Sequence, residues 1–185
     1  MARTIAVVNQ KGGVGKTTTA INLAACLAAA GRKTLLVDFD PQGNATSGLG
    51  IEDPGIDGGS YAMVVDQRAF KEIAEKTSLE FLDLVPSGID LTAAEMELAQ
   101  AEKREFWLRE ALMPASSLYD YILIDCPPSL GLLTLNGLVA SDSIIVPLQC
   151  EYYALEGLSK LLQTVSRVRS GLNPDLETEG VLLTM

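Results

Sequence analysis

The chain has 185 residues, 48% of them hydrophobic, which suits a single globular domain with a substantial buried core. Histidine is absent, which excludes the most frequent general base and the commonest metal ligand and leaves any chemistry to Asp, Glu, Lys, Thr and backbone amides. The formal net charge of −10, taken alone, argues against a nucleic-acid-binding surface, because DNA affinity depends largely on lysine and arginine.

The first part of the chain predicts strands alternating with helices around a glycine-rich turn. A β-branched and apolar run predicts a strand over residues 5–8, and an alanine-rich segment predicts a helix over residues 17–30 that Gly31 ends. A continuous apolar run predicts a strand over residues 35–37 of a parallel sheet. Residues 43–60 are rich in glycine, and we expect a long loop with little regular structure.

The same alternation continues to the end of the chain. Helices are predicted near residues 68–76, 92–101 and 105–112, and a strand near residues 79–85. Strands follow over residues 121–124 and 143–147, with a helix between them that starts near Leu132. Apolar residues at helical spacing predict an amphipathic helix over residues 154–170, and a further strand begins at Val181. This order predicts an α/β fold, a doubly wound and mostly parallel sheet with helices on both faces.

The segment KGGVGKTT lies directly after the first predicted strand and before the first helix, where a phosphate-binding loop is expected. Its glycines allow successive N–H groups to converge on phosphate oxygens at the positive end of the helix dipole. Lys16 is placed to reach the β- and γ-phosphates, and Thr17 offers a hydroxyl to Mg²⁺. Because Gln10 stands where the general pattern GxxxxGK[ST] has glycine, this is a P-loop with a deviant Walker A motif. The predicted nucleotide-binding residues are Lys11, Gly12, Gly13, Val14, Gly15, Lys16, Thr17 and Thr18.

Aspartates follow two of the predicted strands, at Asp38 and Asp40 in DFDPQGN and at Asp125 in ILIDCPPS. We expect all three to face the phosphates, because ligands of such sheets bind at the carboxyl ends of the strands. Asp125 is the predicted Mg²⁺ residue together with Thr17, and Asp40 is placed to act on the attacking water. For Asp38, a capping role at a turn remains an alternative.

Lys11 is a second cation beside a site in which Lys16 already fills the usual lysine role. It could act across a dimer, as an arginine finger does, by stabilising the charge that hydrolysis spreads over the γ-phosphoryl oxygens. A solvated loop lysine is the alternative, and the residues alone leave both open.

Four segments, VNQKGGVGKTTTAINLA, VDFDPQGNATSGLG, YDYILIDCPPSLG and VPLQCEYYALEGL, together resemble the ParA/Soj family of Walker-type partition ATPases. The resemblance implies that ATP and Mg²⁺ are the cofactors and that Lys11 contacts nucleotide on the partner subunit of an ATP-dependent homodimer. It further implies that Lys16 and Asp40 take part in hydrolysis, that Asp125 binds Mg²⁺ indirectly, and that residues 127–129 sense the γ-phosphate.

The resemblance also implies a cellular role. Similar proteins bind DNA without sequence preference as ATP dimers, and a ParB-type partner stimulates hydrolysis in a cycle that moves chromosomes or plasmids. We expect a cytoplasmic, nucleoid-associated protein without membrane contact, since no stretch reaches the roughly 18 apolar residues of a membrane span. Family members continue beyond the strand at Val181. Residues 1–185 are therefore expected to be one P-loop ATPase domain, truncated at its C-terminus and lacking most of the basic residues that bind DNA.

Other interpretations are a truncated interaction domain that does not hydrolyse ATP, a MinD-like positioning ATPase, and a P-loop enzyme that phosphorylates or activates a small molecule. MinD-like proteins end in a membrane-binding amphipathic helix, and nothing here resembles that tail. The small-molecule enzyme would need an acceptor pocket, and no polar cluster is assigned to one.

Overall fold

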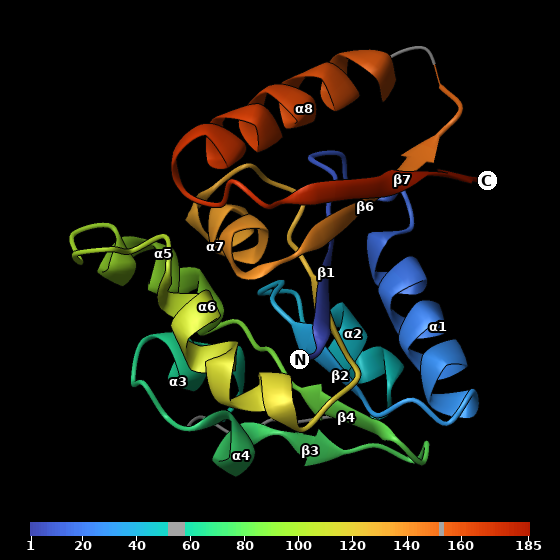
Figure 1. Ribbon diagram of the computed structural model, residues 1–185, viewed down its shortest axis with the longest axis vertical. Helices are drawn as coiled ribbons and strands as arrows, with labels where there is room; N and C mark the ends of the chain where they lie inside the picture. Colours follow the sequence, from blue (N-terminus) through green and yellow to red (C-terminus); the bar gives the residue numbers. More distant parts are fainter. Residues whose placement is uncertain (52–57, 152–153) are drawn as a thin grey trace.

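The computed structural model describes residues 1–51, 58–151 and 154–185 (Figure 1). The described residues form a seven-stranded sheet in the order β3-β4-β2-β5-β1-β6-β7, in which β3 is antiparallel to β4 and the other neighbours are parallel. The predicted doubly wound fold class is thus confirmed. The strands are β1 (Arg3–Val7), β2 (Thr34–Asp38), β3 (Glu75–Lys76), β4 (Leu82–Val85), β5 (Tyr121–Asp125), β6 (Ser143–Gln149) and β7 (Glu177–Thr184).

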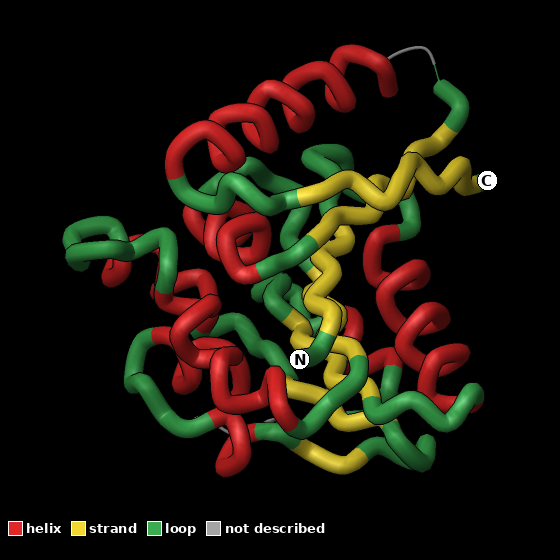
Figure 2. The backbone as a smooth tube through the Cα atoms, in the orientation of Figure 1, coloured by secondary structure: helices red, strands yellow, loops and turns green. Residues whose placement is uncertain are grey.

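Helices lie on both sides of this sheet (Figure 2). One core cluster joins Ile5 and Val7 to the small residues of the first helices, and the other joins Ala6 and Val8 to the remaining helices. Alternate residues of a strand point to opposite faces, which is why β1 contributes to both clusters. The first face carries α1 (Lys16–Ala29) and α2 (Asn44–Gly48), and the second carries α3 (Gly59–Val64), α4 (Phe70–Ile73), α5 (Leu91–Leu98), α6 (Trp107–Leu112), α7 (Leu132–Ala140) and α8 (Ala154–Gly171).

The helices α1 and α8 agree with their predictions. In α1, Ala20, Ala24 and Ala28 are buried at a spacing of four residues, and their small side chains let the helix pack closely on the sheet. It ends before Gly31, whose φ of 75° is left-handed. Helix α8 buries an apolar stripe of Leu161, Val165 and Val168. Within the described residues, no helix is both long enough and apolar enough to cross a bilayer.

Three predictions between residues 43 and 85 are wrong in part. Residues 43–60 are not without regular structure, because α2 forms after a left-handed Gly43 and α3 starts at Gly59; residues 52–57 of that prediction lie outside the described ones. The helix predicted over residues 68–76 is confined to α4, because the chain then turns into β3 and pairs antiparallel with β4. Strand β4 begins at Leu82 and not at residue 79, because Phe81 has a left-handed φ of 67°. The 3-10 helix Met113–Ser117 was not predicted.

The register of the central strands fixes where the following loops lie. Asp125 at the end of β5 pairs with Val7 of β1 on one side and with Asp38 of β2 on the other. Since these strands are parallel, their carboxyl ends meet at one edge of the sheet, and the loops after β1, β2 and β5 are neighbours there.

Candidate functional site

The loop between β1 and α1 borders a cleft of about 800 Å³ at this edge of the sheet. Gly13 and Gly15 have φ values of 74° and 86°, a backbone conformation that other residues rarely adopt. Such a loop turns successive N–H groups towards one point in front of the helix, which is the arrangement that binds phosphate. The loop residues that line the cleft are Gly12, Gly13, Gly15, Lys16, Thr17 and Thr18.

Lys16 is the charged group at the start of α1. Its side chain is only 7% exposed, and its Nζ donates a hydrogen bond to the carbonyl oxygen of Lys11 at 3.2 Å. Burial lowers the pKa of Lys16, whereas the carboxylates of Asp125 and Asp40 oppose that shift. The amine is therefore partly desolvated beside two acids, a setting in which an anion is held strongly.

Asp40 lines the same cleft and lies in the loop after β2. It is 5% exposed, and its Oδ1 accepts a hydrogen bond from the N–H of Gln42 at 3.0 Å, which orients the carboxylate. Gln42 and Asn44 line the cleft too and are joined by a hydrogen bond of 3.0 Å. They were not among the predicted site residues, although their position directly after Asp40 was a usable signal.

Asp125 is fully buried at the end of β5 behind the loop. Neither of its carboxylate oxygens has a hydrogen-bond partner by distance and angle among the described residues, although the Thr17 hydroxyl is close enough to favour the charged form. Burial raises the pKa of Asp125 to about 7, Thr17 and Lys16 act against that rise, and Asp38 and Asp40 add to it. An unpartnered buried carboxylate beside a threonine hydroxyl suits a hard divalent cation or the water bound to one.

Because of Asp125, we expect the stability of the nucleotide-free protein to depend on pH. Its folded pKa of about 7 exceeds the ordinary aspartate value of about 3.9, so the folded chain holds a proton that the unfolded chain releases between these values. The free energy of unfolding should fall as the pH rises from about 4 to about 7. Over this range, we expect the free energy of unfolding of Asp125→Asn to fall by about 1–3 kcal/mol less than that of the wild type. Thermal unfolding at a series of pH values without Mg²⁺ measures this difference.

Some decrease of the free energy of unfolding with pH should remain in Asp125→Asn, because burial raises the pKa of Asp38 as well. The matched control is Asp175→Asn at an exposed position, which should reproduce the wild-type slope. An Asp125→Asn slope equal to that of the wild type would contradict the assignment of the titration to Asp125.

Asp38 itself does not face the phosphate cleft, contrary to the expectation for all three aspartates. Its Oδ2 accepts hydrogen bonds from the N–H and the Oγ1 of Thr46 at 2.8 and 2.7 Å, and its Oδ1 accepts one from the N–H of Asp40 at 3.2 Å. Thr46 in turn accepts from the N–H of Ser87 at 2.8 Å. Asp38 thus has the capping role left open for it, and it fixes the loop that carries Asp40.

Lys11 points away from the cleft that Lys16 lines. Its Nζ pairs with the carboxylate of Glu151 and lies 3.4 Å from Oε1 of Gln149, both just after or at the end of β6. It borders a neighbouring cavity of about 560 Å³ that is shared with Pro128, Ser129 and the start of α8. Gln149 and Glu151 were not predicted, although β6 neighbours β1 in a parallel sheet and its end must lie beside this loop.

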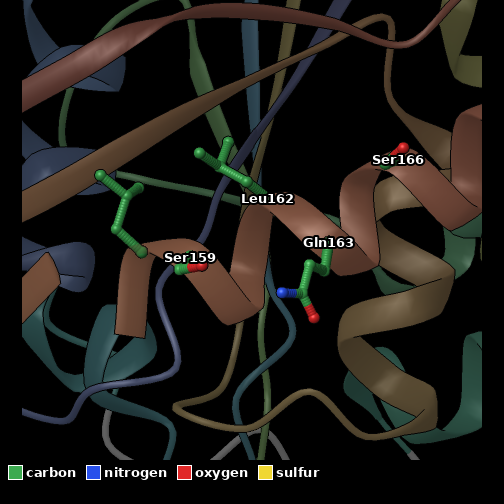
Figure 3. Close-up of a pocket in the computed structure, with 5 residues that line it drawn as sticks. Ser159, Leu162, Gln163 and Ser166 are labelled. Atoms are coloured by element: carbon green, nitrogen blue, oxygen red, sulfur yellow. The ribbon is translucent and has the colours of Figure 1, made fainter. Parts of the chain in front are cut away.

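A further groove of about 410 Å³ runs along α8. All of its lining side chains come from this one helix (Figure 3), and none of them is acidic, basic or a thiol. It therefore offers no group that is charged or that titrates near neutral pH. The lining residues are Leu158, Ser159, Leu162, Gln163 and Ser166.

Comparison with known proteins relates this site to a family. Residues 2–178 match the family described as AAA domain. Over 185 residues the chain is 61% identical to the chromosome partitioning protein ParA of Myxococcus xanthus and 58% identical to the sporulation initiation inhibitor protein Soj of Bacillus subtilis. It spans 65% and 73% of the lengths of these two proteins.

Solved structures with the same fold include proteins with bound nucleotide. Cobyrinic acid a,c-diamide synthase from Mycobacterium smegmatis, with ADP and magnesium, matches with a TM-score of 0.94 and 43% identity over 99% of this chain and 74% of that one. A plasmid partition protein from Borrelia burgdorferi matches with a TM-score of 0.88 and 32% identity over 98% and 79%. The chain therefore belongs to the AAA domain family of P-loop ATPases, in its ParA/Soj group.

Proposed function

We propose that this chain is the nucleotide-binding part of an Mg²⁺-dependent ATPase that acts as a dimerisation switch in the partitioning of chromosomes or plasmids. The observation that carries the proposal is the meeting of Lys16, Thr17 and Asp40 at one cleft, in front of the unpartnered carboxylate of Asp125. The sequence similarity to ParA and Soj proteins supports the partitioning role.

The residues of the cleft have separate roles in ATP hydrolysis. The amides of residues 11–18 and the Lys16 ammonium hold the phosphates, and Thr17 and Asp125 would hold Mg²⁺, directly or through water. When bound, Mg²⁺ neutralises charge on the β- and γ-phosphoryl oxygens. Asp40, fixed by Gln42 and by the Asp38 network, orients the attacking water and accepts its hydrogen bond.

Lys11 would act on nucleotide held by a second copy of the chain. Its Nζ is turned out of the cleft, where Glu151 and Gln149 hold it. In a dimer, the Lys11 ammonium would leave Glu151 and contact the γ-phosphate of the nucleotide bound to the facing copy. There it would neutralise the negative charge of the transition state. Hydrolysis would then depend on dimerisation, and the bound nucleotide would control partner binding.

Mixing two inactive variants tests this arrangement. Lys11→Ala keeps its own Lys16 and should bind ATP, and Asp40→Asn also binds ATP and keeps the Lys11 that it can offer to a partner. Each variant alone should be inactive. An equimolar mixture should regain about one quarter of the wild-type rate of ATP hydrolysis, because half of the dimers are mixed and each of those holds one complete site.

The control uses Lys33→Ala in place of Lys11→Ala. Lys33 is an exposed lysine in the turn before β2, and this variant should hydrolyse ATP as its own homodimer, without the second variant. If the mixture stays as inactive as its components while the control is active, Lys11 does not act between chains. The proposal of a dimerisation switch would then fail.

Non-specific DNA binding, stimulation by a ParB-type protein and association with the nucleoid complete the proposed cycle. They rest on the ParA and Soj relatives, because the residues present carry a net charge of −10. The test is the rate of ATP hydrolysis with duplex DNA, with a ParB-type protein, and with both. If neither DNA nor the ParB-type protein changes the rate of hydrolysis, the remaining interpretations are a truncated interaction domain and a MinD-like positioning ATPase.

A second candidate function comes from the structural match to a cobyrinic acid a,c-diamide synthase at 43% identity. An enzyme of that class would use ATP to activate a small carboxylic acid. Hydrolysis that depends on such an acid, and is indifferent to DNA, would favour this function over partitioning.

A further inference from the structure

Asn9 is a buried polar residue at the point where the chain leaves β1 and enters the phosphate-binding loop. It is 4% exposed and comes two residues before Lys11. It is not among the residues that line the phosphate cleft. A buried side-chain amide destabilises the fold unless its donor and its acceptor have partners, so the contacts of Asn9 indicate what it holds in place.

The amide nitrogen of Asn9 joins the loop to β6, which lies beside β1 in the sheet (Figure 1). The N–H of Val8 donates to the carbonyl oxygen of Ile145 at 3.0 Å, as in a parallel ladder. The next bond of that ladder would reach the carbonyl oxygen of Pro147, two residues further along β6. Asn9 Nδ2 donates to that oxygen at 2.7 Å in place of a backbone N–H. The chain can therefore leave the sheet after Val8 while the Pro147 carbonyl keeps a donor.

The amide oxygen of Asn9 fixes the backbone of Lys11. Asn9 Oδ1 accepts a hydrogen bond from the N–H of Lys11 at 3.0 Å, which closes a turn of the asparagine type. Only one orientation of the side-chain amide presents a donor to Pro147 and an acceptor to Lys11, so the two bonds support each other. The carbonyl oxygen of Lys11 accepts in turn from Nζ of Lys16 at 3.2 Å. These contacts run from β6 through Asn9 and Lys11 to the Lys16 ammonium.

We propose that Asn9 is a positioning residue for the phosphate site and acts through the backbone of Lys11. This inference rests on the proposed function, in which the loop holds the phosphates of ATP. Because the Lys11 peptide is fixed before nucleotide binds, the start of the loop and the place of Lys16 are set in advance. The loop then needs little further ordering when ATP binds, and such preorganisation raises affinity.

Two substitutions of Asn9 separate this role from a purely structural one. Asn9→Ala removes both hydrogen bonds and should raise the dissociation constant for ATP with Mg²⁺ about ten-fold in isothermal titration, because the nucleotide itself must then order the loop. Asn9→Ser keeps an oxygen that can accept from the Lys11 N–H but is too short to reach Pro147. It should raise the dissociation constant only about three-fold, while its melting temperature stays as low as that of Asn9→Ala.

Hydrogen exchange of the Lys11 amide tests the geometry without nucleotide. Exchange should be slow in the wild type, at least about ten-fold faster in Asn9→Ala, and intermediate in Asn9→Ser, because the serine oxygen restores part of the bond. The matched control is Asn173→Ala. Asn173 is 8% exposed, and its Nδ2 donates to the carbonyl oxygen of Ser141 at 2.7 Å, before the start of β6 and thus at the other edge of the sheet. This variant should lower the melting temperature and leave both ATP affinity and Lys11 exchange unchanged.

The outcomes distinguish this inference from the proposed function. If the wild type binds ATP and both Asn9 variants bind it equally well, the role of Asn9 is overturned and the proposed function stands. Equal losses of affinity in Asn9→Ala and Asn9→Ser would also overturn the role, because the loss would then follow the bond to Pro147 and not the bond to Lys11. If Asn9→Ala does not fold, the same decision rests on Asn9→Ser, whose affinity must be below that of the wild type. A wild-type chain that binds no ATP would overturn both the proposed function and this role.

Discussion

Replacing Lys16 by alanine is expected to abolish ATP binding at ordinary nucleotide concentrations. Lys16 is 7% exposed and stands beside the buried acids Asp40 and Asp125, so its loss removes the cation that offsets both the acids and the phosphates. Truncating one member of a buried charge pair costs about 2–5 kcal/mol, which corresponds to a dissociation constant raised about 30-fold or more. Isothermal titration with ATP and Mg²⁺ measures the change.

The comparison variant is Lys33→Ala, which removes the same side chain from an exposed turn and should bind ATP as the wild type does. The melting temperature without nucleotide should fall in Lys16→Ala, because the variant leaves the buried carboxylates of Asp40 and Asp125 without their cation. Unchanged ATP affinity in a folded Lys16→Ala variant would show that the cleft is not the nucleotide site.

Sequence periodicity predicted the long elements of the fold and failed for the short ones. Strands such as β1 and β5 and the helices α1 and α8 have their own apolar patterns, and these patterns agree with the burial in the structure. The short helices α2 and α3 depend on contacts with distant segments. The Ser60 hydroxyl donates to the carbonyl oxygen of Asp38, and Thr46 is fixed between Asp38 and Ser87. No local pattern of residues 43–64 records such contacts.

For the candidate site, the sequence predicted several residues that the structure brings to one edge of the sheet, but not all of their neighbours. The loop, Asp40 and Asp125 are found from their positions after strands, because the carboxyl ends of parallel strands share one edge. The direction of Lys11 could not be predicted, since it depends on Glu151, which lies 140 residues further along the chain. The inward turn of Asp38 depends likewise on Thr46, eight residues away in a helix that was not expected.

Replacing Asp40 by asparagine is expected to separate hydrolysis from binding. Asparagine keeps the shape of the side chain and an oxygen that accepts the N–H of Gln42, so the loop should hold its conformation. It cannot take up a proton from the attacking water, and loss of a general base or water-orienting group costs about 100-fold to 10,000-fold in rate. The rate constant for hydrolysis under single-turnover conditions is the quantity to measure.

The affinity of Asp40→Asn for ATP should equal or exceed that of the wild type, because a carboxylate that repels the phosphates from the cleft wall has lost its charge. ATP-bound protein, and with it the dimer, should therefore accumulate in this variant. Asp66→Asn, at an exposed position after α3, is the matched change and should hydrolyse ATP at the wild-type rate. If Asp40→Asn lowered affinity and rate by the same factor, the carboxylate would serve to hold the nucleotide, and the water would have to be oriented by another residue of the cleft.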